Sequence, residues 1–139
     1  MDKLQVIQLA AEKGGPERRQ VLEKLMVYAR GKGCQVDAGG GRVGGINIRF
    51  GSIGYAILDI STEGDVKLYA QPHPTKAAPE ELSQKINDFL AENGEQLKLK
   101  SFPINCHGLL VPKAEEIPLD ALIGFLEFSL QCIMETYYS

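Results

Sequence analysis

The sequence is poor in the features that mark several large classes of protein. Its 139 residues include no tryptophan, two histidines and three cysteines, Cys34, Cys106 and Cys132. The cysteines are odd in number and contain no Cys-x-x-Cys pair, so neither a disulfide framework nor a zinc site is indicated. This usage is typical of a reducing compartment, and we expect the protein in the cytoplasm.

Basic charge and long apolar runs are also scarce. Fifteen Lys and Arg stand against eighteen Asp and Glu, a formal charge of −3, whereas nucleic-acid binders usually show a clustered basic face. No apolar run approaches the roughly 20 residues of a membrane span. The first residues, MDKLQVIQLAAEKGG, carry Asp2 and Glu12 around a short apolar stretch and make a poor signal peptide. We therefore expect neither nucleic acid nor membrane as a partner.

The clearest pattern that is present is a meander of three strands in residues 44–72, GGINIRFGSIGYAILDISTEGDVKLYAQP. Gly51-Ser52 favours a two-residue type II′ turn, because glycine supplies the positive φ, and this turn would pair Ile48 with Tyr55. A second two-residue turn at Glu63-Gly64 would follow. One face then holds most of the large apolar residues: Ile46, Ile48, Phe50, Ile53, Tyr55, Ile57, Val66, Leu68 and Ala70. A three-residue loop over residues 63–65 would instead swap the faces of the third strand.

Helical patterns flank the meander. Apolar residues at three- and four-residue spacing, with proline at the first turn, predict core helices over residues 16–30, 79–93 and 118–137. A short helix over 2–12, ended by Gly14-Gly15, would precede them. Short strands are predicted at 34–36, 97–100 and 106–111. We expect one α+β domain over residues 1–139, with 1–15 as an N-terminal segment and 16–138 as the core.

No motif predicts catalysis. Cys106 and His107 resemble a nucleophile with its base, but adjacent strand residues point to opposite faces. The glycine-rich stretch 39–45 lacks the Lys-Ser/Thr end of a phosphate-binding loop and leads into a strand, which favours a flexible loop. Glu115 and Glu116 precede a helix, where capping and the helix dipole explain them. We expect no enzyme, cofactor or metal.

The second face of the predicted meander is half apolar. Ala56, Leu58, Ile60 and Tyr69 alternate there with polar residues, a mixture that suits docking of another polypeptide or a cover from the N-terminal segment. Asp59 falls on the opposite, buried face in this register, where an unpaired carboxylate would be costly. It lies at the edge of the sheet near the turn, or it pairs with a nearby base or marks a pocket, which His73 could also line.

The last predicted helix is apolar on more than one side. Beside its core stripe lie Phe125, Phe128 and Cys132. Either the helix is buried between the sheet and other elements, or this flank meets a second copy of the chain, since exposed apolar patches usually mark interfaces.

The order helix, three strands, helix, two strands, helix resembles the type III secretion chaperone-like fold, which secretion chaperones share with the YbjN-like family of bacterial proteins. Three stretches carry the resemblance, INIRFGSIGYAILDISTEGDVKLYA, ELSQKINDFLAEN with the strand pair after it, and PLDALIGFLEFSLQCIMETYY. It implies a small, acidic, cytoplasmic homodimer without a cofactor. For secretion chaperones it also implies surface patches that hold extended segments of client proteins.

The expected function is therefore a non-enzymatic, protein-binding chaperone or adaptor. Its expected client contacts are Ala56, Leu58, Ile60 and Tyr69, and its expected dimer contacts are Phe125, Phe128 and Cys132. The alternative is a small-molecule-binding or regulatory module with a pocket near Asp59 and His73.

Overall fold

Helices packed on one face of an antiparallel sheet make up the computed structural model, which describes residues 1–39, 42–51, 54–70 and 79–138. In these residues the sheet has five strands in the order β1-β2-β3-β4-β5. The elements are α1 (Lys3–Gly31), β1 (Gln35–Ala38), β2 (Gly45–Phe50), β3 (Tyr55–Ser61), β4 (Val66–Tyr69), α2 (Glu80–Glu92), β5 (His107–Leu109), the 3₁₀ turn η1 (Ala114–Glu116) and α3 (Leu119–Tyr137). The predicted α+β class is confirmed.

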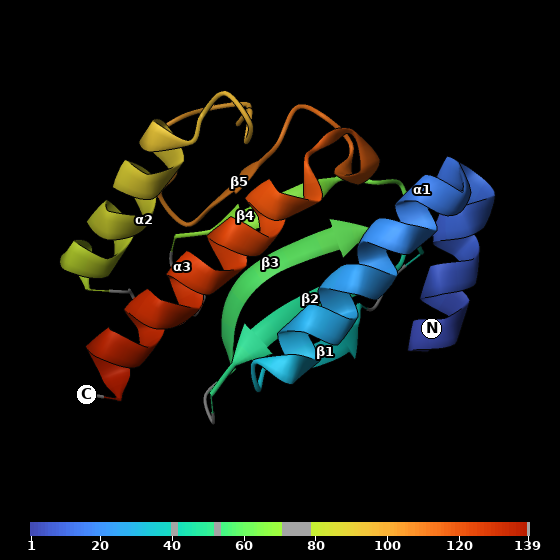
Figure 1. Ribbon diagram of the computed structural model, residues 1–139, viewed down its shortest axis with the longest axis horizontal. Helices are drawn as coiled ribbons and strands as arrows, with labels where there is room; N and C mark the ends of the chain where they lie inside the picture. Colours follow the sequence, from blue (N-terminus) through green and yellow to red (C-terminus); the bar gives the residue numbers. More distant parts are fainter. Residues whose placement is uncertain (40–41, 52–53, 71–78, 139) are drawn as a thin grey trace.

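The molecule has two layers (Figure 1). α1 and α3 cross in front of the sheet, and α2 lies beside α3. The core lies between the layers and includes large side chains that are almost completely buried: Leu22, Leu25, Ile46, Ile48, Leu58, Ile60, Leu68, Leu82, Ile86, Leu90 and Phe125. None of the described helices covers the other face of the sheet. No helix in the described ranges combines the length and hydrophobicity that crossing a membrane requires.

The predicted break between two N-terminal helices is confirmed inside α1. Gly15 has φ 81° and ψ −175°, and Pro16 starts the second segment. Asp2 begins the first segment with a capping box, in which its carboxylate accepts from the Gln5 N–H and its own N–H donates to Gln5 Oε1, both at 2.8 Å. Val6 and Ala10 of this segment are fully buried, so residues 1–15 belong to the same core.

The predicted register of β2 against β3 is wrong throughout. Tyr55 pairs with Phe50 and not with Ile48, and Ile48 pairs with Leu58, so Ile57 is an extra residue in a β-bulge. The bulge moves Leu58 and Ile60 onto the helix-covered face, where both have no exposed surface. A strictly alternating β3 would have buried the Asp59 carboxylate instead, and the bulge avoids this cost. The predicted two-residue turn at Gly51-Ser52 is wrong as well, because the pair Phe50–Tyr55 leaves four residues, 51–54, between the strands. Ser52 and Ile53 themselves lie outside the described residues.

The connection from β3 to β4 is also one residue longer than the predicted two-residue turn. Ser61 N–H donates to Asp65 O at 2.9 Å, which leaves Thr62, Glu63 and Gly64 as a three-residue loop. This loop lies one position before the three-residue alternative at residues 63–65, and Gly64 has φ 87°. Its effect cancels that of the bulge, so Val66 and Leu68 lie in the core as predicted.

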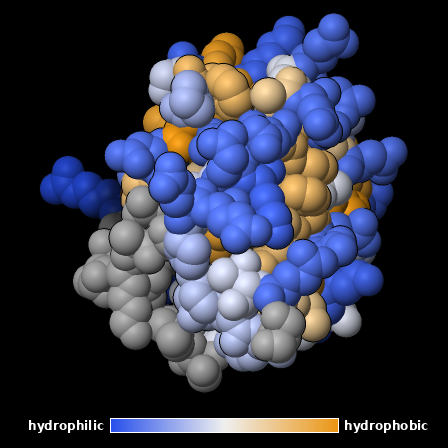
Figure 2. All heavy atoms as spheres, turned by 90° about the vertical axis from the view of Figure 1, so that its left-hand side faces the viewer, coloured by the Kyte–Doolittle hydropathy of each residue, from blue (hydrophilic) through white to orange (hydrophobic). Residues whose placement is uncertain are grey.

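The flank of α3 that was expected to meet a second copy is covered within the same chain. Phe125 is fully buried and Cys132 is 4% exposed. Phe128 stacks on Phe89 of α2, with ring centroids 4.4 Å apart and planes 17° apart. From the side on which α2 lies, the surface is largely hydrophilic with hydrophobic stretches between (Figure 2). The buried-helix alternative is therefore correct for this flank, and the predicted dimer contacts are wrong for Phe125 and Cys132.

Arg18 ties three distant parts of the chain together. This side chain is only 6% exposed, and its guanidinium donates to both carboxylate oxygens of Glu115, at 2.9 and 2.7 Å. A third N–H donates to the carbonyl of Thr62 at 3.1 Å. The ion pair raises the pKa of Arg18 and lowers the pKa of Glu115. α1, the β3–β4 loop and η1 therefore meet at one buried cation. Glu115 and Glu116 both lie in the first turn of a helix, as the predicted dipole effect requires, but the capping hydrogen bond is made by Glu116, whose carboxylate accepts from the Lys113 N–H. Glu115 pairs with Arg18 instead.

Candidate functional site: the open sheet face

The candidate site is the sheet face that no described helix covers, which we call the open sheet face. Because side chains alternate along each strand, residues that pair across the strands share this face. One row runs straight across it, from Asp37 to Asn47, Asp59, Lys67 and Leu109. A second row contains Gln35, Arg49, Tyr69 and His107. The face is therefore mostly polar and carries charges of both signs.

Asp59 is the centre of this face because it lies on the middle strand and is half-buried. The Tyr69 hydroxyl donates to its Oδ2 at 2.6 Å. The Asn47 amide is assigned with its nitrogen toward Asp59, because the reverse orientation would bring two acceptors together. In this orientation it donates to both carboxylate oxygens. Burial raises the pKa of Asp59, while the bond from Tyr69 and the charge of Lys67 act in the opposite direction. The predicted position of Asp59, opposite Leu68 on the buried face, is wrong.

Of the predicted client contacts, Tyr69 and Ala56 lie on the open sheet face, and of these two only Tyr69 is partly exposed. Its pKa is raised by burial and by the hydrogen bond to Asp59, so the phenol stays protonated and acts as a donor. The His107 ring lies 5.7 Å from it and is tilted by 53°. Ala56, opposite Arg49, is only 9% exposed, and Leu58 and Ile60 lie in the core. The predicted contact set therefore does not form one surface.

A depression of about 440 Å³ lies beside the Asp59 network. Asn47, Asp59, Lys67 and Leu109 line it from the strands, and Glu63 and Asp65 line it from the β3–β4 loop. Hydrogen-bond donors and acceptors of this kind can orient a polar ligand, but they do not include an activated nucleophile with a base. The described residues contain no group of three potential metal ligands. His73, the other predicted pocket residue, lies outside the described residues.

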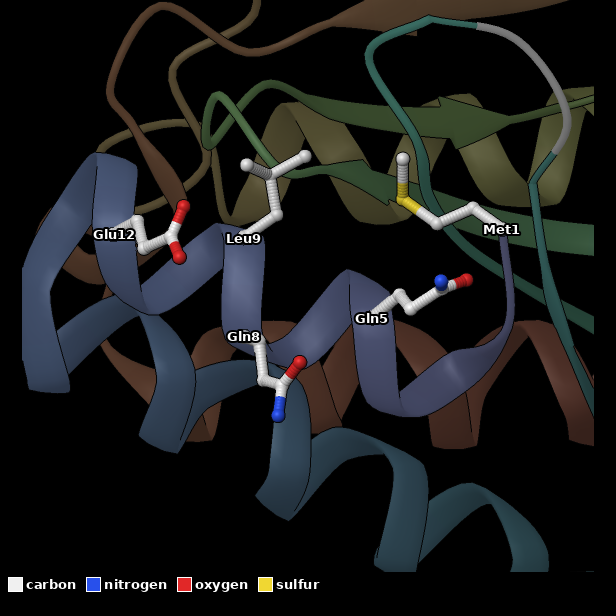
Figure 3. Close-up of a pocket in the computed structure, with 5 residues that line it drawn as sticks. All are labelled: Met1, Gln5, Gln8, Leu9 and Glu12. Atoms are coloured by element: carbon white, nitrogen blue, oxygen red, sulfur yellow. The ribbon is translucent and has the colours of Figure 1, made fainter.

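A second depression of similar size lies along the N-terminal segment of α1, lined by Met1, Gln5, Gln8, Leu9 and Glu12. Its side chains do not converge (Figure 3). Met1 and Leu9 point to one side of the helix, whereas Gln8 points away from them. This arrangement is typical of a solvated helix surface, and it offers no polar group aimed at a ligand.

Part of this site was not predicted from the sequence. The Asn47–Asp59–Tyr69 network forms only because the bulge turns Asp59 outward. Lys98 and Lys100 lie next to β5, where Leu99 bridges to Leu110, and both lysines are exposed. Their signal was visible in the alternation of Leu97, Lys98, Leu99 and Lys100, which predicted a strand without a function.

Comparison of the chain with protein-family models, with curated proteins and with solved structures finds no match. The resemblance to type III secretion chaperone-like and YbjN-like proteins therefore stays a prediction. The function has to be inferred from the open sheet face and its surroundings.

Proposed function

We propose that the chain is a non-enzymatic, protein-binding chaperone or adaptor that holds another polypeptide against its open sheet face. The observation that supports this proposal is the sheet itself, which has helices on one face and a partly buried mixture of polar and apolar side chains on the other. Leu109 is 36% exposed and Val111, just beyond β5, is 60% exposed. Mixed faces of this kind bind polypeptides through side-chain contacts and through strand edges.

The chemistry of the face supports binding better than catalysis. Asp59 and Tyr69 satisfy each other at 2.6 Å, and the amide of Asn47 supplies the remaining donor. A carboxylate with two donors and a protonated phenol is a rigid recognition element. The polar groups of this element already have hydrogen-bond partners, so a bound polypeptide would gain more binding energy from contacts with the exposed residues around it.

The proposal places the protein in the cytoplasm, for which the cysteine usage is the support. It also includes a homodimer, which the resemblance to type III secretion chaperone-like proteins implies. The contacts of such a dimer would not include Phe125 and Cys132, because both are buried within the chain itself. Sedimentation at micromolar concentration tests the dimer. A monomer there would remove the homodimer from the proposal and leave client binding untouched.

The proposal is tested by site-specific photocrosslinking in the cell of origin. A benzophenone amino acid replaces Leu109 on the open sheet face or, as a matched control, Val27, which is 70% exposed on α1. We expect a discrete protein adduct from position 109 and none from position 27. Absence of an adduct at 109, or equal adducts at both positions, would contradict the proposal.

The second candidate is a small-molecule-binding or regulatory module, and the depression beside Asp59 favours it. A native mass spectrum of the purified protein would then show a bound small molecule. The Asp59→Asn variant would lose that mass, because the exchange removes the charge but keeps the shape. A ligand of this kind together with no crosslinked protein would favour this candidate over the first.

A further inference from the structure

The sheet continues one segment beyond β5. Lys100 N–H donates to Leu109 O at 2.8 Å, Val111 N–H donates to Lys98 O at 2.6 Å, and Leu99 bridges to Leu110 between these bonds. In Figure 1 this segment follows the upper end of α2 and leads toward β5. Within the described part of the chain, residues 98–100 therefore form the outer edge of the sheet on this side, which we call the 98–100 edge.

The 98–100 edge has backbone groups available for pairing. In an antiparallel pair, the residue between two ladder bonds points its N–H and C=O away from the neighbouring strand. Leu99 has this position, and neither of its backbone groups makes a backbone hydrogen bond to another described residue. An extended peptide can therefore add to the sheet here and gain two main-chain hydrogen bonds at Leu99.

The open-face side of the edge is basic. Lys98 and Lys100 point to this side, because Leu99 between them packs on the helix side against Gly108. Neither lysine forms an ion pair with a described residue. Asp65, just before β4, is already paired with Lys113 at 2.7 Å. In a chain of net charge −3, these two cations are complementary to acidic residues two positions apart on an added strand.

The helix side of the edge is apolar. A groove of about 420 Å³ runs between the C-terminal part of α2 and this segment, lined by Leu90, Ala91, Gly94, Leu97, Lys98, Leu99 and Phe102. Phe102 is 49% exposed at its rim. On an added strand, the residue between the two acidic ones would point to this side, and an apolar side chain would bury the exposed ring.

We propose that the 98–100 edge binds an extended peptide segment with the pattern acidic–apolar–acidic, which pairs with Leu99, places its acids beside Lys98 and Lys100 and inserts its apolar side chain into the groove. The inference rests on the proposed function, since it names the class of polypeptide and the edge that receives it. A nucleic acid fits this edge less well, because the groove is apolar and the phosphates would meet only two lysines.

The test uses synthetic peptides with one central triplet between Gly-Ser flanks, titrated into the full-length ¹⁵N-labelled protein. We expect Glu-Leu-Glu to bind and to shift the amides of residues 98–100, and Glu-Ser-Glu and Lys-Leu-Lys to bind at least about tenfold more weakly. Methylation of the leucine nitrogen in Glu-Leu-Glu removes a main-chain donor and should abolish the shift at Leu99. Equal binding of the methylated peptide would overturn the strand pairing.

Two charge-reversal variants make the test specific. Lys100→Glu should weaken binding of the Glu-Leu-Glu peptide about tenfold and strengthen binding of the Lys-Leu-Lys peptide. Lys24→Glu, on the exposed side of α1, should leave both affinities unchanged. Unchanged affinity in Lys100→Glu would overturn the inference, and so would lysine-dependent binding of a single-stranded oligonucleotide in preference to the peptide.

The outcomes separate this inference from the proposed function. If Glu-Leu-Glu does not bind at millimolar concentration while position 109 still crosslinks to a protein, the peptide class is wrong and the proposed function stands. If neither the peptide nor any protein is captured, both are wrong. Binding of the peptide with a discrete adduct at position 109 supports both.

Discussion

Loss of the Arg18 guanidinium is expected to be one of the most destabilising single changes in this protein. Arg18→Met keeps the apolar stem but removes the guanidinium, which makes three hydrogen bonds to Glu115 and Thr62. Breaking a buried pair by removing one partner costs about 3–5 kcal/mol. The Glu115 side chain is 19% exposed, so water partly solvates the abandoned carboxylate. We therefore expect the lower end of this range, about 3 kcal/mol in the free energy of unfolding.

The assay is urea unfolding combined with a thermal scan. For a domain of this size, about 3 kcal/mol corresponds to a fall of roughly 10 °C in Tm. Arg19→Met is the matched control, because Arg19 pairs with Glu23 on the surface, where both side chains are about half exposed, 50% and 47%. It should change the free energy of unfolding by less than about 0.5 kcal/mol.

A double-mutant cycle with Glu115→Gln isolates the ion pair. We expect a coupling energy of about 1–3 kcal/mol at pH 7. The pKa of Glu115 is lowered in the folded protein, so the coupling is present above its unfolded value of about 4.3 and is lost as the pH falls through the lower folded pKa. Coupling under about 0.5 kcal/mol at pH 7, or equal losses for Arg18→Met and Arg19→Met, would refute the reasoning.

Three further predictions concern Leu58 in the core, Asp59 on the open sheet face and Asn87 on α2. Leu58→Ala should cost about 3 kcal/mol by urea unfolding, because Leu58 is fully buried, whereas Leu109→Ala should cost under about 0.5 kcal/mol; similar losses would mean that the bulge is misplaced. The pKa of Asp59 is raised, so stability should fall as the pH rises from about 3.9 through the folded pKa; Asp59→Asn should remove this slope in pH-dependent unfolding, and an unchanged slope would exclude Asp59 as its source. Asn87→Ala loses three hydrogen bonds, so it should lower the free energy of unfolding by about 1–3 kcal/mol and speed hydrogen exchange of the Ile104 amide. Gln84→Ala, on the same helix, is the control and should change neither quantity.

Most of the frame could be predicted from local signals. Proline, glycine and the apolar spacing give the starts and ends of the helices within a few residues, including the break at Gly15. The third strand of the meander has its predicted face, with Val66 and Leu68 in the core. These features depend on backbone preferences and on periodicity, which neighbouring residues determine.

The rest depends on contacts that periodicity does not encode. The run Ala56-Ile57-Leu58 has no alternation from which a bulge could be read, so Leu58 and Ile60 were expected on the wrong face. The apolar flank of α3 was ambiguous because only tertiary packing shows that Phe89 of α2 covers it. Ion pairs between residues far apart in the sequence could not be predicted either, because they too depend on tertiary packing. Arg18 and Glu115 are 97 positions apart, and neither residue type at its position indicates the other.

The hydrogen bonds of Asn87 have a consequence for recognition at the groove. Its amide donates to Ile104 O and its oxygen accepts from Ile104 N–H, both at 2.9 Å, so a side chain of α2 takes the place of a neighbouring strand. The groove has Leu90 and Ala91 of α2 on one wall and Phe102, two residues before Ile104, on the other. These two hydrogen bonds therefore link the two walls before any peptide arrives. In the proposed binding mode, walls that are already held together would reduce the conformational entropy lost when a short segment binds.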